Sequence, residues 1–289
     1  MHFLILGDSS GLLIKKGTHC LNFHNKLMTT VLRLPDKVKT YLKYFTENVK
    51  FGDFESIMSS VNYIMFRKTP SRNRLIESRQ GLFFCRKHTT DFMYANYAYE
   101  YHLKKFIDQY TDKFKVYMDI GSCIGDYSIW LSGKGLKCHA FEPVESNFNS
   151  LKVNVLLNNL QDNVNLYNFG LGSKTEKVSF NITETNKGSC GIDKNCDCAE
   201  KNIQIRTLDE ISDNLSIGKD EGVIMKLDVE GMEIDVLQGA REFIRDRKDL
   251  IIICECTLST KDNIIDLLDS LGNFRYVDVD QFNFAAVKQ

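Results

Sequence analysis

Glycines and acids gather directly after a short apolar run, an arrangement that suits the binding of a nucleotide-like cofactor. The stretch is DIGSCIGD, residues 119–126. Ligands of doubly wound sheets bind beyond the carboxyl ends of the strands, and glycine lets the backbone approach a ligand without a Cβ clash. The spacing is G-x-x-x-G and not the G-x-G-x-x-G of the dinucleotide fingerprint, so it favours a cofactor without a pyrophosphate. We predict that the cofactor contacts Asp119, Gly121, Ser122, Cys123 and Gly125.

Two acids carry the charge of this predicted site. The Asp119 carboxylate is suited to accept hydrogen bonds from a cationic amino-acid group of the cofactor, and its alternative role is a helix cap. Glu142 ends the next apolar run, 21 residues after Gly121 (142 − 121). An acid at that place can accept hydrogen bonds from two ribose hydroxyls. The alternative is that Glu142 is a surface acid. This is disfavoured once its position is considered together with that of the glycine-rich stretch.

A second charged stretch, KLDVEGME, occupies residues 226–233. In an extended chain Lys226, Asp228 and Glu230 alternate to the same side. Charges at the end of an otherwise apolar strand are costly unless they face a polar site, and a carboxylate there can orient a substrate hydroxyl or act as its general base. We therefore predict that these three residues form the catalytic group. The alternative for Glu230 is that it stabilises the N-terminus of the next helix.

Five apolar runs position these residues, at 116–119, 136–141, 163–168, 223–227 and 250–256. Between them lie stretches whose apolar residues are spaced three and four apart, which is the helical pattern. Strands that alternate with helices predict a parallel sheet covered on both faces. Residues 275–279 and 282–287 are too close in sequence for a helical crossover, so we expect an antiparallel hairpin. The predicted class is α/β, with a mostly parallel seven-stranded sheet and a C-terminal hairpin, the Rossmann-like architecture of class I methyltransferases.

The region before this pattern is less regular. We interpret residues 1–80 as a mainly helical N-terminal extension and residues 81–289 as the domain that carries the chemistry. Helices are expected over 34–48, 54–65 and 94–110, and a strand over 81–86. An aromatic series near the last helix suits an acceptor pocket or the packing of a helix on the domain; its members are Phe92, Tyr94, Tyr97, Tyr99 and Tyr101.

Composition and charge argue against several classes of protein. Lys plus Arg is 37 and Asp plus Glu is 38, and this balance disfavours a nucleic-acid-binding protein. A basic segment between residues 72 and 87 keeps that alternative open, although a solvated loop is favoured. No apolar run approaches the ~20 residues of a membrane span, and no signal-peptide pattern is present. Nine cysteines, several of them in apolar runs, are typical of a reducing compartment. We therefore expect a cytoplasmic protein that does not act at a membrane.

The sequence resembles the FkbM-type methyltransferase family over residues 115–257. The stretches that carry the resemblance are MDIGSCIGDYSIWL, HAFEPVESNFNSLKVNV, IRTLDEI, VIMKLDVEGMEIDVLQGAREFI and IIICEC. The resemblance implies S-adenosyl-L-methionine as the methyl donor and usually a hydroxyl oxygen as the acceptor, here on a sugar or other small molecule. It also implies that Gly121, Gly125 and Glu142 bind the cofactor, while Asp228 and Glu230 lie near the transferred methyl group.

Further residues of this comparison leave alternatives open. Upstream, RKHTTD at residues 86–91 resembles the family's Arg…Thr-Asp element, and Glu255 matches a family acid that approaches the substrate or satisfies neighbouring backbone. The family commonly has Ala-Asn where this chain has Ser122-Cys123. Because the amide of that asparagine is absent here, a non-catalytic member of the family remains an alternative. A methyltransferase that acts on nucleic acid or protein is a second alternative. A nicotinamide oxidoreductase is disfavoured by the glycine spacing and the hairpin.

A metal is not expected in the site. The sulfonium of the donor is already activated, so the reaction itself requires none. Three cysteines cluster in a polar insertion, but zinc normally takes four ligands and a fourth is not nearby. These are Cys190, Cys196 and Cys198.

Overall fold

The computed structural model describes residues 36–182, 190–192, 200–256 and 261–289. The chain forms two compact units, residues 1–46 and residues 47–289. Within the first unit the described residues belong to helix α2 (Asp36–Lys50), close to the helix that the sequence predicts over 34–48. The second unit contains the sheets and all residues predicted to do chemistry.

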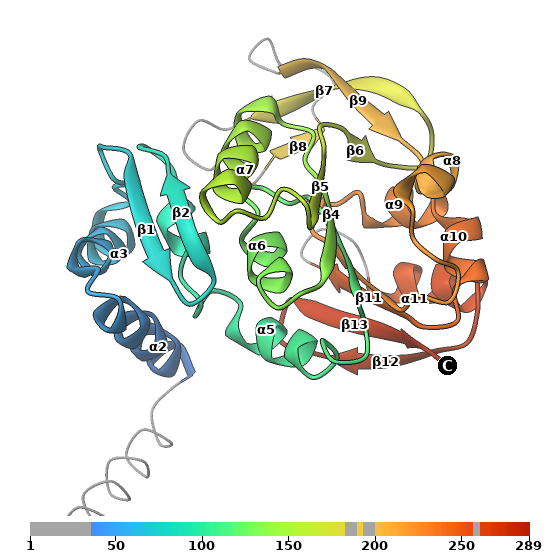
Figure 1. Ribbon diagram of the computed structural model, residues 1–289, viewed down its shortest axis with the longest axis horizontal. Helices are drawn as coiled ribbons and strands as arrows, with labels where there is room; N and C mark the ends of the chain where they lie inside the picture. Colours follow the sequence, from blue (N-terminus) through green and yellow to red (C-terminus); the bar gives the residue numbers. More distant parts are fainter. Residues whose placement is uncertain (1–35, 183–189, 193–199, 257–260) are drawn as a thin grey trace, which may run out of the picture. The chain divides into compact units, whose positions relative to one another are not determined.

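A seven-stranded sheet forms the centre of the second unit (Figure 1). In spatial order its strands are β12 (Phe274–Asp278), β13 (Asn283–Lys288), β11 (Leu250–Glu255), β10 (Val223–Leu227), β3 (Val116–Ile120), β4 (Lys137–Phe141) and β5 (Val164–Tyr167). The strands from β11 to β5 are parallel, and β13 is antiparallel to both of its neighbours. The predicted parallel sheet with a C-terminal antiparallel hairpin is therefore confirmed.

The strand order creates the place where a site can form. Strand β3 lies between β4, the next strand in the chain, and β10, which follows much later. The direction of winding reverses at β3, and ligands of such sheets bind beyond the carboxyl ends of the strands at this reversal. The register pairs Lys226 of β10 with Asp119 of β3, so two charged residues lie side by side at this end of the sheet.

Strand β3 also shows why both faces of the sheet are covered. All five of its residues are buried. Tyr117 packs into the core on one face, whereas Met118 and Ile120 pack into the core on the other. Successive side chains of a strand point to opposite faces, so apolar residues at successive positions require a helical layer on each side. The one charged residue of the strand, Asp119, therefore needs polar partners inside the molecule.

Helices cover the two faces as the sequence predicts. The first core includes residues of α5 (Tyr101–Asp108), α6 (Asp126–Ser132) and α7 (Glu145–Leu157). The second includes residues of α8 (Leu208–Ile211), α9 (Glu233–Gln238), α10 (Arg241–Asp246) and α11 (Lys261–Asp269). A short 3-10 helix, η1 (Ser212–Leu215), follows α8. Within the described residues, none of the helices is long and apolar enough to cross a membrane.

Two smaller sheets complete the described part of the second unit. One is the hairpin of β1 (Arg74–Ser78) and β2 (Gly81–Cys85), which follows helix α3 (Phe54–Phe66). The other has the order β6 (Gly170–Leu171), β9 (Glu200–Arg206), β7 (Glu176–Ile182) and β8 (Cys190–Ile192). The strand predicted over 81–86 and the helix predicted over 54–65 are confirmed. The sequence did not predict strand β1 or the four-stranded sheet.

The helix predicted over residues 94–110 is wrong in its first half. Helix α4 (Asp91–Tyr94) ends where the predicted helix begins, turns follow, and α5 starts only at Tyr101. Glu100, directly before α5, has a left-handed φ of 47°. A continuous right-handed helix cannot pass through this conformation, which costs roughly 1–2 kcal/mol for a residue with a Cβ atom. The local cost at Glu100 is one reason to ask what its side chain contacts.

Candidate active site

Loops from the carboxyl ends of β3 and β10 lie in close contact. Gly121 has a φ of 91°, and a Cβ atom there would lie 2.0 Å from the carbonyl oxygen of Asp228. Gly125 has a φ of 84°, and its Cβ atom would lie 2.3 Å from Cδ1 of Leu151. The sequence explained both glycines by the approach of a ligand. The structure adds a second reason, because each glycine makes room for protein atoms that shape the site.

An apolar cavity lies beside these loops. Its hydrophobic walls are Ile120, Phe141, Pro143, Val144, Leu171, Val229, Ile205 and Met232. They come from the ends of β3 and β4, from the small sheet and from the loop after β10. These walls offer hydrophobic contact to a planar, weakly polar ring, while the acids of the lining, Glu142, Asp228 and Glu230, are left for its polar substituents. We call this cavity the apolar cavity.

Glu142 is the buried acid of the apolar cavity, with 4% of its surface exposed. One carboxylate oxygen accepts from the backbone N–H of Cys123 at 2.8 Å, and the other from the N–H of Val144 at 2.8 Å. Burial raises the pKa of Glu142 to about 8, against the lowering effect of these N–H groups and of Arg86. Glu142 is therefore not a surface acid. Each of its oxygens retains a lone pair for a hydroxyl donor.

A second cavity adjoins the first, and the two share Gly121, Cys123, Asp228 and Glu230. Its other lining residues are Tyr94, Tyr99, Glu100, Asp119, Ser122, Asp126, Tyr127, Lys226 and Glu255. Six of its lining side chains are carboxyl groups, and Lys226 is the one Lys or Arg among them. We call it the acidic cavity. Two members of the aromatic series, Tyr94 and Tyr99, line it, whereas Phe92 and Tyr97 belong to the core.

Lys226 and Asp228 form a buried ion pair in the acidic cavity. The Nζ atom of Lys226 lies 2.6 Å from Oδ2 of Asp228 and 3.9 Å from Oε2 of Glu100. Burial by itself lowers the pKa of Lys226, but the carboxylates of Asp228 and Glu100 raise it well above its usual range. Burial by itself raises the pKa of Asp228, but the Lys226 ammonium brings it below its usual value. Both groups are therefore charged at neutral pH.

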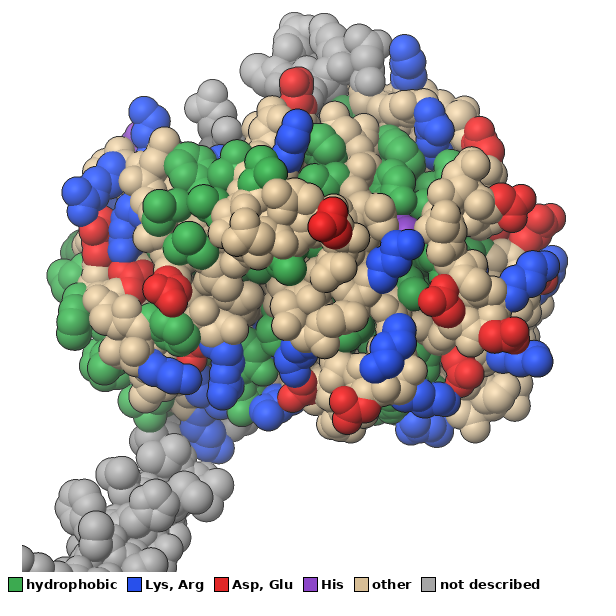
Figure 2. Space-filling view, viewed as in Figure 1, with side chains coloured by type: hydrophobic (Ala, Val, Ile, Leu, Met, Phe, Trp, Pro, Cys, Tyr) green, Lys and Arg blue, Asp and Glu red, His purple; other side chains and the backbone are tan. Residues whose placement is uncertain are grey.

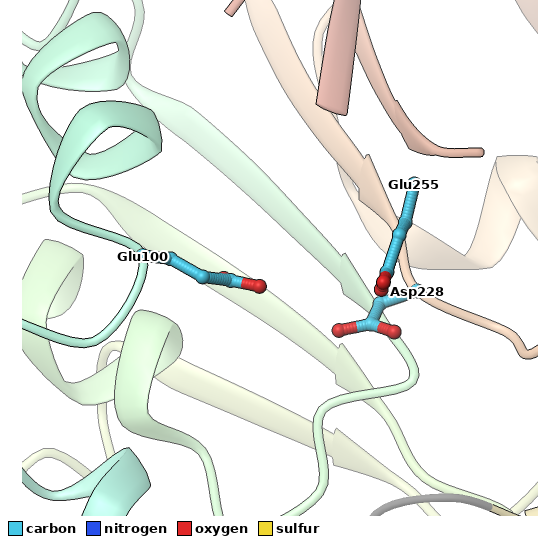
Figure 3. Close-up of side chains that lie close together, drawn as sticks. All are labelled: Glu100, Asp228 and Glu255. Carbon is cyan, nitrogen blue, oxygen red and sulfur yellow. The ribbon is translucent and has the colours of Figure 1, made fainter. Parts of the chain in front are cut away.

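Two more acids face Asp228 across this cavity. Glu255 projects from the end of β11 and Glu100 from the segment before α5, and both carboxyl groups point towards Asp228 (Figure 3). One oxygen from each of the three acids lies within 4.8 Å of the others. Three carboxyl groups so close suit a cation, and the Lys226 ammonium already provides a positive charge there. The sequence left the role of Glu255 open and missed Glu100, whose only signal was its place inside the aromatic series.

Asp119 is held by side chains and not by a helix end. Ser128 donates its hydroxyl to one oxygen of Asp119 at 2.6 Å, and Tyr117 donates to the other at 3.3 Å. Burial raises the pKa of Asp119 to about 6, partly offset by Lys226 and Ser128. The N-cap of the following helix α6 is Gly125. The helix-cap alternative for Asp119 is therefore wrong, and its carboxyl group lines the acidic cavity instead.

Ser122 and Cys123 keep the loop after β3 in shape. The Ser122 hydroxyl lies 2.8 Å from the carbonyl oxygen of Asp119 and 3.2 Å from that of Phe141. Cys123 has a left-handed φ of 47° and uses its backbone N–H to hold Glu142. Glu230, in the turn after β10, also has a left-handed φ, of 51°, and it lines both cavities.

The upstream Arg…Thr-Asp element forms an internal ion pair beside the site. The guanidinium of Arg86 lies 2.7 Å from Asp91 and donates to the side chain of Asn147 at 2.9 Å. Asn147 belongs to α7 and lines the apolar cavity. The pair therefore joins the segment after β2 to the wall of the apolar cavity, and it raises the pKa of Arg86 against the effect of burial.

Other arginines of the basic segment are also paired with acids. Arg72 contacts Glu55 at 2.5 Å. Arg74 pairs with Asp53 and lies 3.3 Å from Glu55. These contacts fix α3 to the hairpin β1–β2 and leave less positive charge for a phosphate backbone than the sequence suggested.

The thiols of the described residues are unpaired. Cys196 and Cys198 of the predicted cluster lie outside the described residues, as does the side chain of Cys190. The free cysteines of the described part are Cys85, Cys123, Cys138, Cys254 and Cys256.

The matching family model is the Methyltransferase FkbM domain, over residues 119–276. This chain belongs to the FkbM methyltransferase family. It is thus an S-adenosylmethionine-dependent methyltransferase, and the match covers the loops after β3, β4 and β10 together with Glu255. The site fits such a cofactor, because a buried acid beside apolar walls adjoins a cavity rich in carboxyl groups. A comparison with curated proteins gave no match.

Solved structures similar to this FkbM methyltransferase are remote in sequence. A SAM-dependent methyltransferase from Aquifex aeolicus is 16% identical, with 64% of this chain and 87% of that chain covered and a TM-score of 0.38. One from Agrobacterium tumefaciens is 7% identical, with 77% and 72% covered and a TM-score of 0.45. A putative methyltransferase from Streptococcus mutans in complex with SAH is 12% identical, with 65% and 97% covered and a TM-score of 0.38.

Proposed function

We propose that this methyltransferase transfers a methyl group to a hydroxyl oxygen of a sugar or another small acceptor. The apolar cavity holds the adenine ring, and Glu142 accepts hydrogen bonds from the ribose hydroxyls. The loop of residues 121–125 lies beneath the cofactor, with Gly121, Ser122, Cys123 and Gly125 setting its shape. Asp119 attracts the cationic amino-acid end of the cofactor from the acidic cavity.

The acceptor oxygen, the methyl carbon and the sulfur must lie in one line, and the residues of this chain hold the reactants in that alignment. When bound, the cofactor supplies a methyl group on a positively charged sulfur. Asp228 accepts a hydrogen bond from the acceptor hydroxyl and holds its oxygen towards the methyl carbon, and Glu230 contacts the same acceptor from the next turn. Lys226 keeps Asp228 ionised. Such alignment lowers the activation free energy of methyl transfer by several kcal/mol, since the reactants have already lost the freedom to adopt unproductive orientations.

The charge of the acidic cavity is the observation that carries the choice of acceptor. Six carboxyl groups line it against one lysine. A phosphate-rich acceptor would meet repulsion there, whereas a neutral polyhydroxyl compound can donate hydrogen bonds to carboxylates. The ion pairs of Arg72 and Arg74 with acids of the same unit also argue against a phosphate-rich acceptor. The backbone N–H of Cys123 still donates a hydrogen bond to Glu142, which supports a catalytic member over a non-catalytic one.

Cofactor binding is tested first. Isothermal titration with S-adenosylmethionine and S-adenosylhomocysteine should show micromolar binding by the wild-type protein. Binding should be lost in Glu142→Ala and kept in Glu145→Ala, a matched change at an exposed acid three residues later. If neither ligand binds the wild-type protein, the assignment of this site is wrong and the non-catalytic alternative gains support.

The acceptor is tested separately with methyl-labelled cofactor. The enzyme is incubated with a panel of neutral sugars, phosphorylated sugars, RNA and protein extract, and label is measured in each fraction. We expect label on neutral, hydroxyl-rich compounds and resistance of the product to alkaline hydrolysis, as an ether requires. Label confined to RNA, with an activity that falls steeply as salt is added, would establish the nucleic-acid alternative instead.

The compartment stays a prediction. Unpaired thiols at Cys138 and Cys254, both buried, are expected of a protein that folds under reducing conditions, and we propose the cytoplasm.

A further inference from the structure

Three carboxyl groups and one ammonium share the wall of the acidic cavity, and their arrangement is asymmetric. Asp228 contacts the Lys226 ammonium through Oδ2, and one of its carboxylate oxygens lies within 4.8 Å of an oxygen of Glu255. Glu100 faces the pair from the other side of the cavity, where Tyr127 donates its hydroxyl to it at 2.7 Å (Figure 3). Glu255 has no such ammonium contact among the ion pairs of the described residues.

Two carboxyl groups this close repel strongly when both are ionised. A proton on one of them removes this repulsion and makes that group a hydrogen-bond donor towards the other. Asp228 lies against the ammonium and is the ionised partner, which leaves the proton on Glu255. The pKa directions agree, since burial and Asp228 raise the pKa of Glu255 to about 8 while Lys226 keeps Asp228 low.

We propose that Glu255 is the proton acceptor of the reaction, and that its protonation follows the charge of the cofactor. Glu255 holds its proton when the cavity is empty or contains the neutral product S-adenosylhomocysteine. Glu255 releases this proton to solvent when the cationic sulfonium arrives, because a positive charge nearby favours the carboxylate. This inference rests on the proposed function, which places the sulfonium in the acidic cavity.

The methyl transfer then returns the proton to the same group. The acceptor O–H bond breaks and an O–C bond forms, while the electron pair of the C–S bond stays on sulfur. Glu255, beside Asp228, takes the proton. The cavity loses the sulfonium charge and gains a proton, so the total charge in the cavity is the same before and after the step. Asp228 orients the hydroxyl, and Glu255 provides the basicity that the lysine-paired Asp228 lacks.

Several other ionisable groups face Glu255, and their proton release has to be distinguished from that of Glu255. Glu100 lies across the cavity, and burial raises its pKa too. Lys226 lowers the pKa of Glu255, and Cys256 is its neighbour in sequence. The remaining ionisable groups that line the cavity are Tyr94, Tyr99, Cys123, Tyr127, Asp119, Asp126, Asp228 and Glu230. A test must therefore isolate both the sulfonium charge and the Glu255 carboxyl group.

Proton release on ligand binding provides such a test without any acceptor. The full-length protein is titrated calorimetrically with S-adenosylmethionine and with S-adenosylhomocysteine near pH 8, in two buffers of different ionisation enthalpy. Glu142 and Asp119 face parts that both ligands share, so their contributions cancel in the difference between the ligands. We expect the cationic ligand to release more protons, on the order of half a proton per site. Glu255→Gln should abolish the difference, and Glu77→Gln, at an exposed acid of β1, should not change it.

A second measurement uses the wild-type protein alone. The preference for S-adenosylmethionine over S-adenosylhomocysteine should rise ~5-fold between pH 7 and pH 9, as expected when the sulfonium lowers the pKa of Glu255 by about one unit from about 8. The inference is overturned if both ligands bind with equal proton release and a pH-independent preference, or if Glu255→Gln keeps the difference. If neither ligand binds, the proposed function fails instead. These outcomes are distinct, because the second leaves no binding to compare.

Discussion

The apolar cavity and the acidic cavity adjoin at Gly121, yet they are built on opposite principles. The apolar cavity shares Asp228 and Glu230 with the acidic cavity, and the one carboxyl group that lines it alone, Glu142, is held by two backbone N–H groups. The acidic cavity has six carboxyl groups, and Lys226 provides a buried positive charge among them. The first is suited to hold a ligand in one fixed pose. The second is suited to respond to charge, because each of its groups depends on the protonation of the next.

This difference suggests a division of labour between cofactor binding and chemistry. Backbone donors fix Glu142 whatever the state of its neighbours, so a change at Glu142 should act on affinity. Asp228, Glu255 and Glu100 are linked to one another through Lys226, so a change at one of them should alter the behaviour of the others. Mutations in the two cavities should therefore differ in kind as well as in size.

The largest effect is expected at Asp228. Asp228→Asn removes the carboxylate that orients the acceptor and leaves the Lys226 ammonium with Glu100 as its nearest acid. Turnover should fall on the order of 10²–10⁴-fold, while the affinity for S-adenosylhomocysteine changes by less than about 3-fold. The measurement is label transfer to the acceptor found in the panel, at saturating cofactor. Asp249→Asn, in an exposed pair with Lys113, is the control.

An effect of Asp228→Asn on affinity instead of turnover would contradict the proposed difference between the two cavities. If Asp228→Asn abolished binding of S-adenosylhomocysteine and left turnover of any bound cofactor intact, Asp228 would belong to the binding site. The same experiment on Glu230→Gln decides whether the two acids contribute together. If both variants keep wild-type turnover, the catalytic roles assigned to them are wrong.

The next effect is on affinity at Glu142. Glu142→Gln keeps the shape of the side chain but replaces one of the two carboxylate oxygens with an amide that cannot accept. The dissociation constants of both ligands should rise on the order of 10-fold or more, as the loss of a hydrogen bond to a ribose hydroxyl implies. Turnover at saturating cofactor should stay near that of the wild-type protein. A drop in turnover without any change in affinity would contradict the proposed role.

A third prediction concerns stability and pH in the absence of cofactor. Burial raises the pKa of Glu142 from its usual 4.5 to about 8, so the folded protein keeps a proton that the unfolded chain has released. This contribution to stability is complete below about pH 4.5 and is lost as the pH rises through about 8. The Tm of the wild-type protein relative to Glu142→Gln should therefore fall between pH 6 and pH 9. A constant difference in thermal unfolding across this range would show that Glu142 has an ordinary pKa.

The smallest effect is expected at Cys123. Its left-handed φ of 47° is unfavourable for most residues, and asparagine tolerates it better. Cys123→Asn should raise the free energy of unfolding by about 0.5–1 kcal/mol, measured by urea denaturation. Cys123→Ala should give no such gain, because alanine keeps the backbone cost. If both variants are equally stable, the conformation of the loop is not strained in solution.

The sequence determined the sheet, its hairpin and the place of Glu142 at the end of a strand. Strand β10 was predicted with its observed bounds, because apolar residues and the charges that end the run are local features of the chain. Glu142 could be found for the same reason, as it directly follows the β4 run that points to the site. The small sheet and the break before α5 could not, since the local sequence gives no signal for either and glutamate has no preference for the left-handed φ that Glu100 adopts.

The acidic cavity was decided by the tertiary structure. Lys226 and Asp228 are two residues apart, and their alternation predicted that they meet. Glu100 and Glu255 are separated from them by 126 and 27 residues (226 − 100 and 255 − 228), and no periodicity connects positions so far apart. The strand order places the end of β11 beside the end of β10, which brings Glu255 to Asp228, and the segment before α5 adds Glu100. The pKa values follow from that proximity and from burial, and a sequence contains neither.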